Sequence, residues 1–228
     1  MHSQSRLGTV LRGIGAEMAA LLLAASCAGC DEPGELLCAA CRVGLMPRPV
    51  EIRTPQGLAV RAALPFEGVP ARCIRRLKDS GESSLVRPLG RVLSAVLDGA
   101  SSPDALIVPV PTSRAAFRRR GYRVPELLAR CAGASPHRLL AVASRRADQR
   151  GLDARSRRDN VQGSMHARRR GHAERVILVD DVVTTGATLD EAANALTDAG
   201  FDVLFAVALA ATPRHRRLIE DSSATRRK

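Results

Sequence analysis

Aromatic residues are scarce in this chain. Its 228 residues include no tryptophan, one tyrosine and four phenylalanines, while hydrophobic residues make up 45%. The core must therefore be built from Val, Leu, Ile and Ala, and an aromatic stacking platform for single-stranded nucleic acid is disfavoured. No run of apolar residues approaches the roughly 20 that cross a bilayer, so we expect no membrane span.

Lysine is almost absent as well, since 33 arginines face two lysines and the net charge is +12. The stretch from Arg114 to Arg175 holds 17 arginines and 5 acidic residues, an excess that equals the net charge of the whole chain. Clustered positive charge indicates an anionic partner, either phosphates or nucleic acid. Genome composition is an equally good explanation for the number of arginines, although it explains their clustering less easily.

The N-terminus superficially resembles a lipidated signal peptide. Arg6 and Arg12 precede a short apolar stretch, and Cys27 follows that stretch. Glu17 at its edge, its shortness and a second pattern that includes Cys27 argue against this reading. We expect the first 25 residues to form a helix, the protein to be cytoplasmic, and disulfides to be absent.

Four cysteines form two CxxC pairs, Cys27 with Cys30 and Cys38 with Cys41. Two residues between cysteines let both thiolates turn onto one ion, and two such turns supply the four soft ligands of a closed zinc site. Such a site has no open position for water, so its expected role is structural. The module is too short to bury a core, so metal would supply most of its folding energy.

The remainder of the chain alternates between strands and helices. Strands are expected at 59–66, 105–110, 176–179 and 203–211, and helices at 69–98, 125–132 and 188–199. The stretch 69–98 should be broken near Gly81 and Pro88, and the segment 137–143 fits a strand or a short helix. Apolar runs without alternation are typical of strands in a parallel sheet covered on both faces. The fold class is therefore α/β, with a parallel sheet flanked by helices.

The residues expected to bind a ligand lie in the string VILVDDVVTTGAT at 176–188. A buried strand delivers Asp180 and Asp181 at its C-terminal end, where open α/β sheets bind ligands. The next residues lead into a helix whose N-terminal N–H groups, with nearby threonine hydroxyls, can hold a phosphate. Gly186 lets the backbone approach the anion. The carboxylates can accept hydrogen bonds from sugar hydroxyls or hold Mg²⁺, so the string fits a ribose 5-phosphate.

This string resembles the motif of type I phosphoribosyltransferases that binds phosphoribosyl pyrophosphate (PRPP). The resemblance implies that the two acids take the ribose 2′ and 3′ hydroxyls and that the Thr/Gly loop takes the 5′-phosphate. The expected PRPP site is Asp180, Asp181, Val182, Val183, Thr184, Thr185, Gly186, Ala187 and Thr188.

More of the chain is similar to the ComF/GntX family. The strings CAGC…CAAC, IRRLKDSGE, VPVPTSRAAFRRRGY and QRGLDARSRRDNVQGSM precede the PRPP motif in the family's order. The resemblance implies a type I phosphoribosyltransferase-like sheet behind a small zinc-ribbon-like module. We expect three parts: residues 1–48, the N-terminal helix and zinc module; residues 49–213, the phosphoribosyltransferase-like domain; and residues 214–228, a basic tail.

The family also suggests where pyrophosphate lies. In VPVPTSR a proline-stiffened loop ends a strand, which is where type I enzymes hold pyrophosphate, and nearby basic side chains can clamp its oxygens. The residues expected there are Pro109, Val110, Pro111, Arg120 and Lys78. In the fourth string, Gln149, Leu152, Arg157 and Asn160 match the family's spacing. Two departures stand out: Arg123-Val124 replaces the usual Asn-Gln pair, and Met165 replaces an aromatic.

Two functions are consistent with these features. The first is a phosphoribosyltransferase that binds PRPP with Mg²⁺ and transfers the phosphoribosyl group to an acceptor that the sequence does not identify. The second is a non-catalytic PRPP sensor, or an accessory protein of competence and DNA uptake, that binds single-stranded DNA or DNA-uptake and repair proteins. The zinc module and the basic stretch support the second function, whereas the scarcity of aromatics argues against a stacking platform for single strands. Phosphoribosyltransferase-like chemistry is the description that we favour.

The basic stretch generates a prediction about DNA. If the arginines between Arg114 and Arg175 contact phosphates, affinity for a single-stranded oligonucleotide should fall steeply with salt, because each neutralised phosphate releases a counterion. Fluorescence anisotropy over a salt series measures the slope. Absence of binding at low salt would restrict the role of these arginines to PRPP or to composition.

Overall fold

A five-stranded sheet forms the centre of the computed structural model, which describes residues 26–98, 104–143 and 163–213. Its strand order is β1-β2-β7-β6-β3. The strands are β1 (Val50–Arg53), β2 (Ala59–Pro65), β3 (Leu106–Pro109), β6 (Arg175–Val183) and β7 (Asp202–Ala211). β2, β7, β6 and β3 run parallel. The expected α/β fold with a sheet flanked by helices is confirmed.

The sheet is mixed, however, and not wholly parallel. β1 pairs with β2 in the antiparallel sense, from Val50 opposite Ala62 to Arg53 opposite Ala59. A tight turn joins the two strands, and its Gly57 has a φ of 93°. A turn this short can only return the chain antiparallel, since a parallel connection needs a crossover of a dozen or more residues.

The helices form two layers. One face of the sheet carries α3 (Gly68–Arg75), α4 (Val86–Leu97) and α6 (Val124–Cys131), and the other carries α7 (Ala187–Thr197) with the hairpin β4 (Leu140–Val142) and β5 (Met165–Ala167). The segment 137–143 therefore contains a strand. α5 (Arg114–Arg120) has no buried residue. Across the residues that the structure describes, no helix is long and apolar enough to span a membrane.

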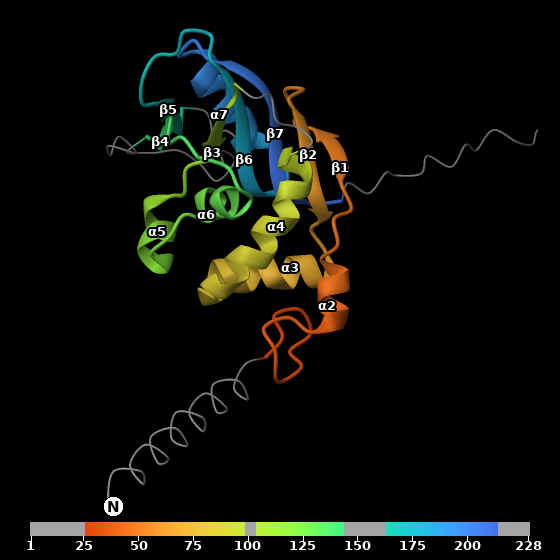
Figure 1. Cartoon of the computed structure of the whole chain (residues 1–228). Coiled ribbons are helices and arrows are strands. Elements are labelled where there is room, and N and C mark those ends of the chain that lie inside the picture. Colours follow the sequence, from red (N-terminus) through yellow and green to blue (C-terminus); the bar gives the residue numbers. More distant parts are fainter. Residues whose placement is uncertain (1–25, 99–103, 144–162, 214–228) are drawn as a thin grey trace, which may run out of the picture.

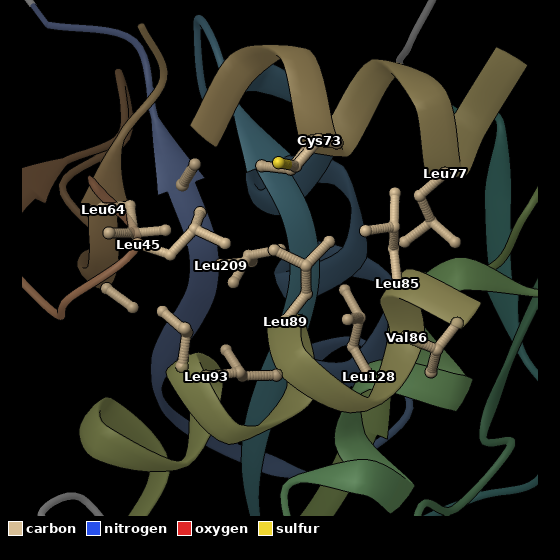
Figure 2. Packing of buried hydrophobic residues seen from close by; sticks show 14 of the residues in the cluster. Leu45, Leu64, Cys73, Leu77, Leu85, Val86, Leu89, Leu93, Leu128 and Leu209 are labelled. Atoms are coloured by element: carbon tan, nitrogen blue, oxygen red, sulfur yellow. The ribbon is translucent and has the colours of Figure 1, made fainter. Parts of the chain in front are cut away.

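Leucine side chains fill the space between the sheet and the first helical layer. Leu77, Leu85, Leu89, Leu93 and Leu128 are fully buried there (Figure 2). α4 and α6 approach closely because α4 carries a glycine, Gly90, where a Cβ atom would lie 2.4 Å from Cys131 Cβ. Cys73 lies in the same core, and Cys131 packs against it.

The expected break near Gly81 in the helical stretch 69–98 is confirmed, whereas Pro88 lies inside α4 and does not interrupt it. After α3 the chain forms a π-helical turn, η1 (Arg76–Ser80), and a 3₁₀ turn, η2 (Ser83–Leu85), before α4 begins. Gly81 between them adopts a left-handed conformation with a φ of 75°, which glycine tolerates at little cost. Lys78 therefore lies in a π-helical turn and not in a regular α-helix.

The cysteine-rich segment packs on the end of α3 and continues into a short helix, α2 (Ala39–Gly44) (Figure 1). Its buried side chains, Cys27, Ala28, Leu37, Cys41 and Leu45, belong to the same apolar cluster as the leucines of α4. Three expected features lie outside the described residues: the N-terminal helix over residues 1–25, the four positions named in the fourth family-like string, and the basic tail over 214–228.

Candidate functional site

Two adjacent carboxylates lie at the C-terminal end of β6. The strand continues beyond Val179 to Val183, so Asp180 and Asp181 are part of its paired backbone, with Asp180 opposite Ala208 of β7. Asp180 is 9% exposed and Asp181 is 7% exposed. The Asp181 N–H donates to Asp180 Oδ1 at 2.8 Å. Burial and the adjacent charge of Asp181 raise the pKa of Asp180 far above its ordinary value.

Lys78 compensates the negative charge of this pair. Its Nζ donates to Asp181 Oδ1 at 2.7 Å, although 103 residues separate the two in sequence. The backbone around Lys78 is held on the opposite side, because Arg120 Nε donates to the Lys78 carbonyl and the Tyr122 hydroxyl donates to the Leu77 carbonyl at 2.5 Å. Arg120 therefore fixes the turn that carries Lys78.

The Thr/Gly loop follows the acidic pair directly. Thr184, Thr185 and Thr188 are exposed, and α7 begins at Ala187 with its N-terminus at this loop. Thr185 Oγ1 accepts a hydrogen bond from the Ala187 N–H at 3.3 Å. A helix N-terminus flanked by exposed hydroxyl groups is suited to an anion.

The structure explains why residue 186 is a glycine, which the sequence alone did not. Its φ of 88° lies in the left-handed region, and a Cβ atom there would lie 3.0 Å from Thr54 Cγ2 and 3.2 Å from Thr54 Cα. Thr54 belongs to the turn between β1 and β2. The glycine is therefore required for packing between the loop and this turn, whether or not an anion is bound.

Two further acids of α7 escaped the sequence analysis. Asp190 and Glu191 are both buried in the first turns of the helix. Asp190 Oδ2 accepts from the Gln56 N–H at 3.2 Å, and Glu191 Oε1 accepts from the Met165 N–H at 3.1 Å. They join α7 to the β1–β2 turn and to β5 and so position the loop, and Asp190 Oδ1 is buried without a hydrogen-bond partner.

The proline loop after β3 lies beside the acidic pair. Val110 N–H donates to the Val179 carbonyl at 2.8 Å, which places Val110 next to the residue that precedes Asp180. This loop borders a pocket of about 370 Å³. The pocket is lined by Pro109, Val110, Pro111, Thr112, Arg114, Arg123, Glu126, Arg138, Leu140, Ala141, Val142, His166 and Arg168.

Four arginines make this pocket strongly positive, although one of them is already paired. Arg138 forms two hydrogen bonds with the buried carboxylate of Glu126, at 2.7 and 2.8 Å, and these bonds lower the pKa of Glu126. Arg130 also contacts Glu126, at 2.6 Å. Glu126 and Arg138 were not predicted as a pair. They lie in α6 and in the segment before β4, and no sequence motif indicates that these two segments meet.

The residues expected at the pyrophosphate thus fall into two groups. Pro109, Val110 and Pro111 line the arginine pocket, whereas Lys78 and Arg120 lie together on the side of Asp181.

The four cysteines of the N-terminal module converge. The sulfur atoms of Cys27, Cys30, Cys38 and Cys41 all lie within 4.8 Å of one another, so the cluster could hold a metal ion. Burial opposes ionisation of Cys27, but N–H groups of Cys38 and Gly29, each 3.4 Å from its sulfur, bring its pKa below the ordinary value. The thiolate is the form that binds metal, whereas burial and the neighbouring thiols raise the pKa of Cys41 in the metal-free cluster.

Comparisons with known proteins agree with this arrangement. Residues 138–226 match the family model of the phosphoribosyl transferase domain. Over 142 residues the chain is 30% identical to Competence protein F of Haemophilus influenzae, a match that covers 57% of this chain and only 62% of that protein.

Similar solved structures include two phosphoribosyltransferases. The adenine phosphoribosyltransferase from Rhodothermus marinus is 19% identical, with 76% of this chain and 88% of that chain covered and a TM-score of 0.37. The orotate phosphoribosyltransferase from Aeropyrum pernix is 17% identical, with 73% and 76% covered and a TM-score of 0.32.

The raised pKa of Asp180 makes a prediction about stability. The folded protein binds this proton more tightly than the unfolded chain, so folding stability is lost as pH rises above the unfolded pKa of about 3.9. Asp180→Asn removes the buried charge but retains an oxygen that can accept from Asp181 N–H. We expect this variant to have a higher Tm than the parent, by a margin that grows from pH 5 to pH 8. A margin that is independent of pH would contradict the raised pKa.

Proposed function

We propose, from the match of residues 138–226 to the phosphoribosyl transferase domain and from the similarity to Competence protein F, that the end of β6 binds PRPP together with Mg²⁺. The observation that carries the proposal is the juxtaposition of two chemically opposite groups on one short segment. Buried carboxylates that accept hydrogen bonds are followed within three residues by exposed hydroxyls at a helix N-terminus. A ribose 5-phosphate presents hydroxyl donors and a phosphate at a matching separation.

In this proposal each end of the segment has its own task. Asp180 and Asp181 accept hydrogen bonds from the ribose hydroxyls, while backbone N–H groups and hydroxyls from Thr184 to Thr188 hold the 5′-phosphate. Val182, Val183 and Ala187 supply backbone, and Gly186 gives the loop its left-handed turn. Because hydrogen bonds to charged groups are stronger than neutral ones, the carboxylates would contribute much of the affinity.

The residues present also fit Mg²⁺. Two carboxylates with a single short contact to Lys78 are hard oxygen ligands of the kind that Mg²⁺ prefers, and PRPP would supply further oxygens. When bound, the ion would neutralise phosphate charge. Lys78, released from Asp181 by the ion, would then be free to contact the pyrophosphate group.

In this proposal the pyrophosphate group lies in the arginine-lined pocket beside Pro109. Pro109 to Pro111 form its wall, and Arg114 and Arg168 add positive charge near the loop. In the transfer reaction an acceptor nucleophile attacks C1 of the ribose, the bond from C1 to the pyrophosphate oxygen breaks, and pyrophosphate leaves with the bonding electrons. Arginines beside the leaving group would stabilise its developing charge, and the protein would contribute positioning and electrostatics.

A second function, in DNA uptake, rests on a separate observation. α5 has no buried residue and presents Arg118 and Arg119 on a surface that does not contribute to the core. The similarity to Competence protein F adds a reason to consider single-stranded DNA or DNA-uptake proteins as partners. In this function PRPP would be a signal that is bound without being consumed.

We also propose that the four-cysteine cluster holds structural Zn²⁺. Four sulfurs at mutual distances below 4.8 Å can be drawn onto a tetrahedral ion with little rearrangement, and all four positions would then be occupied by protein.

The PRPP proposal predicts the effect of removing the acidic charges. Asp180→Asn with Asp181→Asn should weaken PRPP binding at least about tenfold, since each charged hydrogen bond contributes roughly 1.5 to 3 kcal/mol. Calorimetric titration with PRPP and Mg²⁺ measures the change. The matched control is Asp198→Asn with Asp202→Asn, two exposed acids that lie just after α7 and at the start of β7.

Equal affinity of the double variant and the parent would disprove the site, provided that both are folded. A pyrophosphate-release screen over purine, pyrimidine and amine acceptors then separates the two functions. Release with one acceptor identifies a transferase, and PRPP binding without release supports the sensor.

The zinc proposal predicts one zinc per chain. Purified protein should contain stoichiometric zinc by elemental analysis, and Cys27→Ser or Cys38→Ser should lose it together with thermal stability. Cys73→Ser provides the control, because Cys73 is a buried cysteine outside the cluster. Stoichiometric metal in the variant that lacks all four cluster thiols would exclude the assignment.

A further inference from the structure

Two arginines at the end of α3 hold the cysteine module in place. Arg72 Nη1 donates to the Gly29 carbonyl at 2.9 Å, between the first two cysteines. Arg76, one turn later, contacts the Ser26 carbonyl at 3.4 Å, the Ser26 hydroxyl at 3.3 Å and the carboxylate of Asp31. Ser26 directly precedes Cys27, and Asp31 directly follows Cys30, so the guanidinium brackets the first CxxC turn.

Close packing reinforces these polar contacts. A Cβ atom at Gly29 would lie 2.5 Å from Cys41 Sγ and 2.9 Å from Val69 of α3, and one at Gly44 would lie 3.3 Å from Val69. Without side chains at these glycines, the module lies directly on α3. A change in the shape of the module must therefore alter its contacts with this helix.

Val69 lies at the N-terminal end of α3, whereas Lys78 follows its C-terminal end, next to Arg76. Arg76 is the first residue of η1, and Lys78 is two residues further along the π-helical turn. Glu82, after the turn, contacts Arg76 at 3.3 Å, so Arg76 also joins the two ends of the turn. Single π-helical turns are rare and frequently occur at functional sites. The Lys78 ammonium group at 2.7 Å from Asp181 is thus supported from the module side by Arg76.

We propose that Arg76 is a positioning residue that couples the metal-bound state of the four-cysteine module to ligand binding at Asp180 and Asp181, by way of the turn that carries Lys78. The inference rests on the proposed PRPP site.

The physical basis is the fixed geometry at both ends of the turn. The carbonyls of Leu77 and Lys78, in the middle of the turn, are held by Tyr122 and Arg120. Loss of metal removes most of the folding energy of a small cysteine module, and Arg76, the first residue of the turn, then loses Ser26 and Asp31. The start of the turn is then less restrained, the Lys78 side chain samples more positions, and the site is less preorganised for an anionic ligand.

One test measures PRPP affinity in the zinc-loaded protein. Arg76→Gln should weaken binding at least about fivefold, the lower end of typical coupling between sites, while zinc content stays stoichiometric. Arg76→Lys keeps a cation and should lose less. The control is Arg42→Gln, which removes an exposed arginine of the module whose partner, Glu35, is also in the module. Unchanged affinity in zinc-loaded Arg76→Gln would overturn the coupling.

A second test needs no PRPP. Hydrogen–deuterium exchange of the unliganded protein, with and without chelation of zinc, should show faster exchange in the cysteine module, in 68–85 and in 176–188, with little change in 200–211. Faster exchange confined to the module would disprove the coupling. Coupled exchange in a protein that fails to bind PRPP would instead contradict the proposed function and leave the structural connection in place.

Discussion

Burial of two adjacent carboxylates at the end of β6 is the constraint on which the site depends. Ionisation of both carboxylates in this poorly solvated position is costly, which is why the pKa of Asp180 is raised, and the cost is offset only in part by the Lys78 ammonium group and by the Asp181 N–H. A ligand that brings hydroxyl donors and a divalent cation would relieve the strain, so the electrostatic imbalance of the free protein is itself a reason to expect such a ligand.

The surrounding elements can be understood as supports for that pair and for the loop after it. Thr54 packs against Gly186, Asp190 holds the β1–β2 turn, and Glu191 holds β5. Lys78 comes from the π-helical turn, which belongs to the helical layer and not to the sheet. The cysteine module packs against α3, the helix before that turn. A small module far from the ligand in sequence thereby reaches the site through one helix and one side chain.

Features encoded by contiguous residues could be predicted from the sequence. The apolar run at 176–179, the acidic pair and the Thr/Gly loop specify a strand, a turn and a helix, and paired CxxC spacings specify a converging cluster. Features that depend on tertiary pairing could not. Lys78 finds Asp181 across 103 residues, and a charge pattern dominated by arginine does not say that Arg138 pairs with Glu126 while Arg120 holds a carbonyl. The antiparallel β1 alternates apolar and polar residues, but it is only four residues long and lies between Pro49 and Pro55, so its sequence alone does not distinguish an edge strand from a linker.

The most direct test of the account is a crystal structure of the protein with PRPP and Mg²⁺. We predict the 5′-phosphate on the N–H and hydroxyl groups from Thr184 to Thr188, the ribose hydroxyls on Asp180 and Asp181, and Lys78 moved from Asp181 toward the pyrophosphate. PRPP held only by the arginines of the pocket beside Pro109, with the Lys78–Asp181 ion pair intact and the Thr/Gly loop without phosphate, would contradict the central claim.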